Sequence, residues 1–267
     1  MQLQVEARLD YDFHGPVEAL LHLEVAHWPG QRILSEQLSL DPPIAWSRQD
    51  DPGTGERRLV FAHAGPLKIT YQALVDLDPA DHALTGAAQA TVASLPVEAL
   101  PYLRPSRYVE SDLFEQVAAA DFAGLTGGDR VAAILDWMGR AMAYRAWASH
   151  ATSSASSTYM SRAGVCRDFA HVAVALCRAS DIPARMVSAY ALGLKPEDFH
   201  AVIEVYVGGR WRLADPTGLA QPDTLVRIGH GRDAADIPFL TIFGQATMTG
   251  QSVRVLAPWP DPVRAPD

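Results

Sequence analysis

The sequence has only two cysteines among its 267 residues. So few thiols exclude a disulfide framework and a cysteine-rich zinc site. If Cys166 and Cys177 lie on one helix, eleven residues at about 1.5 Å each separate them by roughly 16 Å, whereas a disulfide requires Cα atoms within about 7 Å. We therefore expect two free thiols in a reducing compartment.

Basic side chains are also scarce, with 22 lysines and arginines against 31 acidic residues and a formal net charge of −9. This balance argues against a general nucleic-acid binder, which needs a basic face to neutralise phosphates. No apolar run approaches the roughly 18 residues of a membrane span, and the start MQLQVEARLDYDF lacks the basic and apolar regions of a signal peptide. We expect a globular cytoplasmic protein with no nucleic-acid partner and no membrane partner.

Metal-binding patterns are missing as well. The sequence contains no HExxH and no cysteine pair at zinc spacing, so a zinc hydrolase has no support. Asp76, Asp78 and Asp81 lie close together, but the glycine and distal glutamate of a calcium loop do not accompany them. We expect neither a metal nor another cofactor.

The first hundred residues alternate between apolar and polar side chains, a period of two that is typical of strands. The alternating segments are 3–13, 19–26, 31–40, 57–63 and 67–77. Turns rich in proline and glycine separate them, among them Gly65-Pro66. Many short alternating strands of this kind predict an antiparallel β-sandwich over residues 1–100.

Helical periodicity follows the proline-rich stretch LPVEALPYLRPSRY, which we interpret as a linker. Apolar side chains recur every three or four residues over about 129–143, and again in the segment that follows Gly164. This second helix should end near Ser180, because Pro183 disfavours helical backbone at Ile182.

A glycine pair joins two predicted strands near the end of this region. The strands cover 199–207 and 210–215, and Gly208-Gly209 between them supplies the positive φ that a two-residue hairpin turn requires. In such a hairpin the numbers of paired residues sum to 417, which places Tyr206 opposite Trp211 as a cross-strand aromatic pair.

The same register brings His200 close to Asp215. Asp215 faces Val202, and His200 lies two residues further along on the same face, so the two are diagonal neighbours with Cα atoms about 7 Å apart. A slip of one residue would put them on opposite faces. A carboxylate beside an imidazole fixes its tautomer and stabilises its protonated form.

Cys166 is predicted at the start of the helix that follows Gly164. Unpaired N–H groups and the helix macrodipole favour a thiolate there, which is the nucleophilic form of cysteine. The same N–H groups could bind the oxyanion of an acyl-transfer intermediate. Cys177 lies on the apolar stripe and is interpreted as a core residue, and His171 points about 140° away from Cys166 around the helix.

The blocks GVCRDFAHVAVALCRASDIPARMVSAY and DFHAVIEVYVGGRWRLADPTG resemble those of the bacterial transglutaminase-like superfamily of cysteine enzymes. The resemblance covers roughly residues 100–245. It implies an α+β fold, with an N-terminal antiparallel β-sandwich at 1–100 followed at 101–267 by a papain-like core of helices packed on an antiparallel sheet. It also implies that Cys166 is the nucleophile, His200 the general base and acid, and Asp215 the orienting acid. Val202 departs from the pattern, because many relatives have tryptophan two residues after the histidine.

Together these features predict a thiol-dependent acyl-transfer enzyme that acts on amide bonds of a peptide or protein substrate. Attack of water on the thioester gives hydrolysis, as in a cysteine peptidase or amidase, and attack of an amine gives transamidation. We favour hydrolysis because water is the more abundant acceptor. The alternative is a non-catalytic binding module that retains the fold. The second donor to the oxyanion is not identified by the sequence.

Overall fold

A computed structural model describes residues 1–257, so the end of the predicted core, residues 258–267, lies outside it. The chain is a mixed α+β protein whose large sheets are antiparallel, as predicted. The helices are α1 (Glu115–Asp121), α2 (Gly127–Ala141), α3 (Ala155–Ser161) and α4 (Cys166–Arg178). The strands are β1 (Gln2–Leu21), β2 (Gln31–Asp41), β3 (Trp46–Arg48), β4 (Leu59–Leu77), β5 (Ala143–Tyr144), β6 (Ala163–Gly164), β7 (Ala184–Ala191), β8 (Phe199–Val207), β9 (Arg210–Ala214), β10 (Leu225–Gly231), β11 (Leu240–Phe243) and β12 (Ala246–Leu256). Within residues 1–257, no helix is long and apolar enough to cross a membrane.

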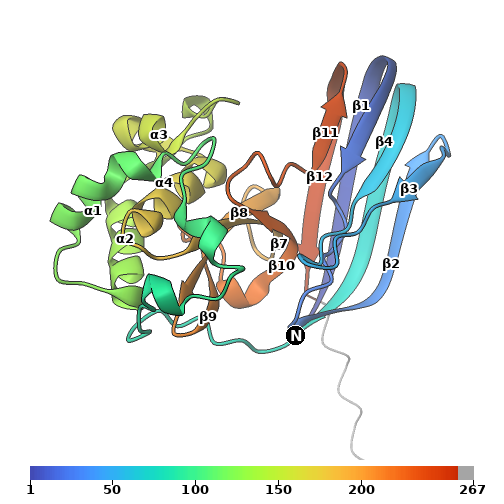
Figure 1. Cartoon of the computed structure of the whole chain (residues 1–267). Helices are drawn as coiled ribbons and strands as arrows, with labels where there is room; N and C mark the ends of the chain where they lie inside the picture. The colour runs from blue at the N-terminus through green and yellow to red at the C-terminus, as the bar shows by residue number, and fades with distance from the viewer. Residues whose placement is uncertain (258–267) are drawn as a thin grey trace, which may run out of the picture.

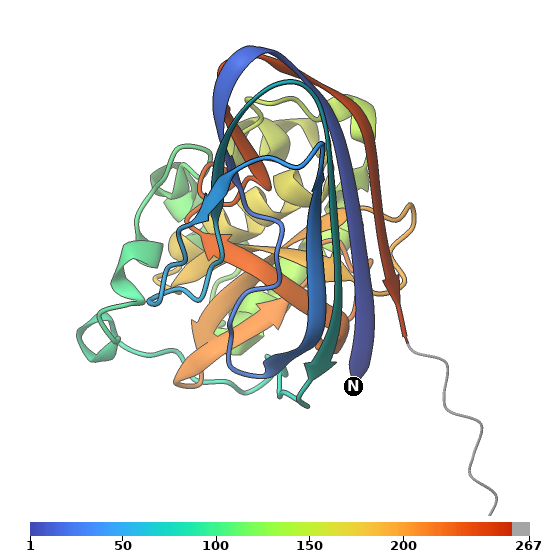
Figure 2. The same ribbon diagram turned by 90° about the vertical axis from the view of Figure 1, so that its right-hand side faces the viewer.

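Strands β1 and β4 both run through places where the sequence suggested a break. The prediction of a turn at Gly65-Pro66 was wrong, because β4 continues through it and stays paired with β1. Gly15 and Gly65 take positive φ values of 125° and 81° beside a register shift between Phe13 and Val17. A bulge of this kind bends two strands together without ending their pairing, and Figure 2 shows them curving over side by side.

The amino-terminal sheet has six strands in the order β11-β1-β4-β2, with β12 also on β1 and β3 on β4. Its strands β11 and β12 come from the end of the chain, and Val255 of β12 lies opposite Val5 of β1. The domain boundary near residue 100 stays a prediction, but the sheet itself extends beyond it. Local periodicity indicates that a segment is a strand and says nothing about a partner more than 200 residues away.

One face of the second, four-stranded sheet is shared between two sets of neighbours. Its order is β10-β7-β8-β9. Met186 and Tyr190 point to the same face of β7, because side chains four residues apart on a strand do so. Met186 packs in the core formed with the helices, whereas Tyr190 packs in the core of the six-stranded sheet. The helices therefore cover one part of this face and the six-stranded sheet covers another. Figure 1 shows the four-stranded sheet between the helices and the six-stranded sheet.

The β8–β9 hairpin has the predicted register. Gly208 and Gly209 have φ values of 63° and 75°, and Tyr206 lies opposite Trp211, so paired numbers sum to 417. The two aromatic rings are 5.5 Å apart in an edge-on arrangement. The register that brings His200 toward Asp215 is thus confirmed.

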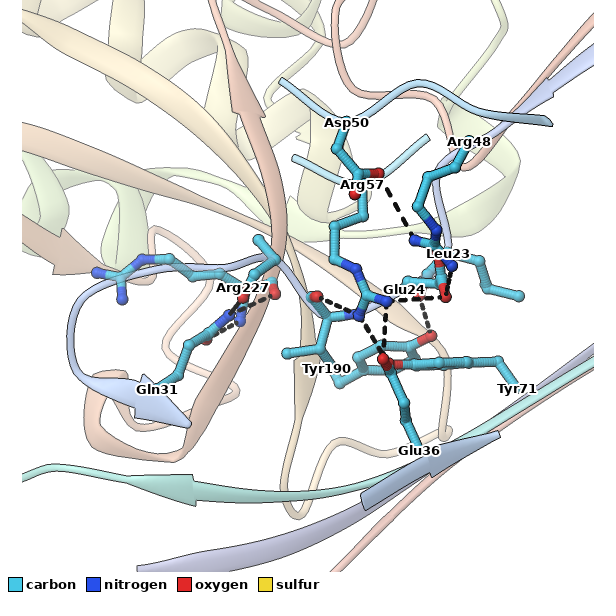
Figure 3. Close-up of polar contacts among 12 residues, drawn as sticks. Leu23, Glu24, Gln31, Glu36, Arg48, Asp50, Arg57, Tyr71, Tyr190 and Arg227 are labelled. Carbon is cyan, nitrogen blue, oxygen red and sulfur yellow. Dashed lines mark hydrogen bonds and ion pairs between the residues drawn. The ribbon is translucent and has the colours of Figure 1, made fainter. Parts of the chain in front are cut away.

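Buried polar contacts fix how the two sheets meet (Figure 3). The Tyr190 hydroxyl, from the four-stranded sheet, donates to the carbonyl of Leu23 at 2.6 Å. The side chain of Gln31 on β2 accepts a hydrogen bond from the Arg227 N–H on β10 at 2.9 Å and donates one to the Arg227 carbonyl at 3.0 Å. Beside these contacts, and within the six-stranded sheet's own side, Arg57 donates hydrogen bonds to Glu24 and Glu36 with only 6% of its side chain exposed.

Candidate active site

Helix α4 begins at Cys166, and two residues fix the turn that leads into it. The carboxylate Oδ2 of Asp168 accepts a hydrogen bond from the Val165 N–H at 2.8 Å. A Cβ atom on Gly164 would lie 2.5 Å from the Cβ of Asp168, so this position has room for glycine alone. The first-turn N–H groups of a helix have no partner within the helix. The turn therefore holds Cys166 where such groups are available.

His200 and Asp215 are in direct contact, as the hairpin register predicts. His200 Nε2 lies 2.9 Å from Asp215 Oδ2, and the two side chains are 0% and 2% exposed. The carboxylate also accepts hydrogen bonds from the Thr217 N–H at 2.9 Å and from the Ala220 N–H at 2.8 Å. Backbone groups thus hold Asp215 in place, and Asp215 in turn orients the ring of His200.

The second ring nitrogen of His200, Nδ1, is not used by the contact with Asp215. Nδ1 is buried and has no hydrogen-bond partner within residues 1–257. Burial alone would lower the pKa of His200, but the hydrogen bond and charge of Asp215, together with the proximity of Cys166, outweigh it and raise the pKa to about 9. Burial would likewise raise the pKa of Asp215, but its contacts with His200 and Thr217 lower it. The arrangement favours a protonated imidazole ring beside Cys166 at neutral pH.

Cys166 and His200 line a cleft of about 390 Å³. Met186 and Ser188 of β7 also line it, as does Phe239, which precedes β11. The cleft thus lies at the junction of the helices, the four-stranded sheet and the six-stranded sheet. A concave site with a nucleophile and a titratable base is the usual form of an enzyme active site.

Tyr144 is a site residue that the sequence did not reveal. It lies opposite Gly164 in the parallel β5–β6 pair, where the Arg145 N–H donates to the Gly164 carbonyl at 2.8 Å. Burial and the proximity of Cys166 raise the pKa of Tyr144 to about 12. The hydroxyl of Tyr144 therefore remains protonated at neutral pH. Strands of two residues are too short to show any periodicity, so the sequence held no signal for this contact.

Asp198 lies at the rim of the cleft and was not singled out by the sequence either. Its Oδ1 accepts hydrogen bonds from the Phe199 N–H and from Nε2 of Gln251 on β12. Partial burial raises the pKa of Asp198. The contact with Gln251 ties the rim of the cleft to the six-stranded sheet.

The other thiol and the other helix histidine serve the core. Cys177 is a free thiol like Cys166 but is fully buried, and burial raises its pKa to about 12. His171 accepts a hydrogen bond from the Ala234 N–H at 3.3 Å, and burial lowers its pKa to about 3. The interpretation of Cys177 as a core residue is confirmed. His171 is buried as well and does not line the cleft.

Two of the three acidic residues considered as calcium ligands are engaged in ion pairs. Asp76 lies 2.7 Å from Arg32, and Asp81 lies 3.1 Å from Arg212. Within residues 1–257, His, Cys, Asp and Glu side chains nowhere gather in threes as metal ligands would.

Comparison with known proteins identifies the family. The sequence profile of the Transglutaminase-like superfamily matches residues 116–216. A crystal structure from Cytophaga hutchinsonii, described as a candidate cysteine protease, is 34% identical, covers 98% of this chain and 92% of its own, and superposes with a TM-score of 0.91. The chain therefore belongs to the transglutaminase-like superfamily, and the resemblance seen in the sequence is confirmed.

Other similar proteins come from mycobacteria. An uncharacterized protein of Mycobacterium tuberculosis is 28% identical over 240 residues, which are 78% of this chain and 75% of that protein. An uncharacterized protein of Mycobacterium leprae is 36% identical over 83 residues, which are 28% of this chain and 29% of that protein.

Proposed function

We propose that the protein is a thiol-dependent acyl-transfer enzyme that hydrolyses amide bonds in peptide or protein substrates, as a cysteine peptidase or amidase does. The observation that carries this proposal is the position of the His200 ring, which is bonded to Asp215 through Nε2 and leaves Nδ1 for Cys166. A nucleophile, a base and a group that orients the base are the parts that covalent acyl transfer requires.

In the acylation step, the Cys166 thiolate attacks the carbonyl carbon of the amide and the electron pair of the C=O bond moves to oxygen. The Cys166 N–H and the Tyr144 hydroxyl donate hydrogen bonds to this oxyanion. As the C–N bond breaks, His200 gives the proton on Nδ1 to the leaving amine. A thioester on Cys166 and a neutral imidazole remain.

In the deacylation step, His200 takes a proton from water while the water oxygen attacks the thioester. The tetrahedral intermediate expels the Cys166 thiolate, which releases a carboxylic acid and restores the thiolate–imidazolium pair. An amine in place of water would give transamidation by the same route. Water is the more abundant acceptor, and this favours hydrolysis.

Labelling with iodoacetamide between pH 5 and pH 10, followed by intact mass and peptide mapping, tests the proposal. An ordinary thiol has a pKa of about 8.5 and loses about tenfold in rate for each pH unit below it. We expect Cys166 to be alkylated nearly as fast at pH 7 as at pH 9, and His200→Ala to restore the steep profile. His150→Ala is a matched control, since His150 is exposed and does not line the cleft.

The buried thiol of Cys177 serves as an internal reference and should stay unlabelled in the native protein. A Cys166 that is unreactive at neutral pH, or a pH profile that is indifferent to His200, would favour the binding module over the enzyme.

A further inference from the structure

The cleft beside Cys166 has an apolar wall that is partly open to solvent. The rings of Phe199 and Phe239 are stacked with centroids 4.7 Å apart and an interplanar angle of 19°, and both are partly exposed. Ile237, Pro238 and Leu240 continue this wall. Exposed apolar surface is unfavourable in water, and an apolar ligand group that covers it removes that cost on binding.

Phe199 of the wall lies on β8, and the rest of the wall belongs to the segment that enters the six-stranded sheet. Residues 237–240 lead directly into β11, where Leu240 lies opposite Leu21 of β1. The Phe239 carbonyl accepts a hydrogen bond from the His22 N–H at 2.9 Å. The wall is therefore anchored to β1 and the residue that follows it, and so to the amino-terminal part of the chain.

The two charged residues of the cleft besides His200, Arg167 and Asp198, both have hydrogen-bond partners within the protein. Arg167 donates hydrogen bonds to the Ser149 hydroxyl and to the carbonyl of His150. Asp198 accepts from Gln251 at the rim. A charged substrate side chain placed on the apolar wall would lose hydration without gaining a partner there.

We infer that the cleft selects an acyl donor with an apolar side chain next to the scissile amide, and that residues 237–240 form the subsite that recognises it. This inference rests on the proposed function and adds a substrate class to it. It also gives the six-stranded sheet a role in catalysis, because the sheet completes the substrate-binding cleft. Phe239 is the specificity-determining residue at the centre of the wall.

Irreversible acyl-like probes can measure this preference on the whole chain. The probes are N-acetyl-X-chloromethyl ketones and N-acetyl-X-glycine chloromethyl ketones, with X as Phe, Leu, Gln, Glu or Lys, so that the side chain is offered at two positions. The rate constant for modification of Cys166 is measured by intact mass. We expect Phe and Leu probes to react at least about tenfold faster than Gln, Glu and Lys probes in one of the two series.

Variants of Phe239 identify the subsite. Phe239→Ala should lower the rate with the Phe and Leu probes by about tenfold while the rate with iodoacetamide stays within about twofold. Phe239→Leu keeps an apolar side chain and should keep the preference for the Phe and Leu probes. This variant shows that a loss of rate in Phe239→Ala is not caused by misfolding. Phe243→Ala is the matched control, because Phe243 lies on β11 with 66% of its side chain exposed and does not line the cleft.

The outcomes distinguish a failure of the apolar subsite from a failure of the proposed function. Equal rates across X, a preference for Lys, Glu or Gln, or a preference that survives Phe239→Ala would each overturn the subsite while leaving the proposed function intact. Failure of iodoacetamide to label Cys166 would overturn both together.

Discussion

Nε2 of His200 lies 2.9 Å from Oδ2 of Asp215, and the backbone N–H groups of Thr217 and Ala220 hold that carboxylate in place. Because the bond involves Nε2, the ring keeps its Nε2–H toward the acid and turns Nδ1 toward the nucleophile. The acid thus sets the tautomer of the ring and, in the proposed mechanism, the direction in which the ring transfers a proton.

Asp215→Asn should therefore reduce kcat/KM by on the order of 10² to 10⁴ while the protein stays folded. The amide keeps the size of the carboxylate but loses its charge, so the imidazolium is no longer stabilised. Steady-state kinetics on an amide substrate, together with thermal unfolding, checks this. A loss in kcat/KM smaller than about tenfold would show that the acid does not orient the ring during catalysis.

The raised pKa of His200 predicts how activity depends on pH. Acylation needs a proton on the ring, so kcat/KM should stay level through neutral pH and fall above about pH 9. The same shift affects stability: a folded-state pKa above the unfolded value of about 6.5 stabilises the protein fully below about pH 6.5, and this contribution disappears as pH rises to about 9.

The stability contribution should be on the order of 2–3 kcal/mol, which urea unfolding at pH 6 and pH 9.5 can measure. His200→Gln lacks the titrating group and should lose less stability than the wild type between these two pH values. A wild-type protein that is equally stable at both pH values would contradict the pairing of His200 with Asp215 and Cys166.

Gly164→Ala should damage both the fold and the reactivity of Cys166. The added Cβ would lie 2.5 Å from the Cβ of Asp168, so the start of α4 must move. We expect a loss of about 2 kcal/mol in the free energy of unfolding and slower alkylation of Cys166 at pH 7. Gly139→Ala in α2 is the control, since its Cβ would meet nothing within 4 Å and should stabilise the helix by about 0.5–1 kcal/mol.

Tyr144→Phe should lower kcat by about 10² with little change in KM, because the hydroxyl would contribute to the oxyanion and not to ground-state binding. The melting temperature should hardly change, since 39% of the Tyr144 side chain is exposed. Tyr206→Phe is the control, because its hydroxyl donates to the Gly209 carbonyl in the hairpin turn. An unchanged kcat in Tyr144→Phe would assign the second oxyanion donor elsewhere.

The sequence predicted those parts of the site that local rules determine. A two-residue glycine turn fixes the register of its hairpin, so the contact between His200 and Asp215 could be derived from numbering alone. The start of α4 at Cys166 was likewise predicted from the glycine before it and the apolar period after it.

The parts that were not predicted depend on pairing between distant segments. Strand β12 joins β1 across more than 200 residues, and the two-residue pair β5–β6 brings Tyr144 to the nucleophile. Neither pairing leaves a local pattern, because hydrogen bonding between backbones is nearly independent of sequence. The prediction of a turn at Gly65-Pro66 failed for a related reason. The same dipeptide is compatible with a turn and with a bulge, and pairing with the partner strand determines which one forms.

Detection of an acyl group on one sulfur atom tests the central claim most directly. The protein is mixed with N-acetyl-phenylalanine 4-nitrophenyl ester, quenched in acid within seconds, and examined by intact mass and peptide mapping. The account predicts one acyl group per chain on Cys166, none on Cys177, none in Cys166→Ala, and formation at least about 10²-fold slower in His200→Ala. An adduct that forms on Cys166 equally fast without His200, or no adduct on Cys166 at all, would contradict it.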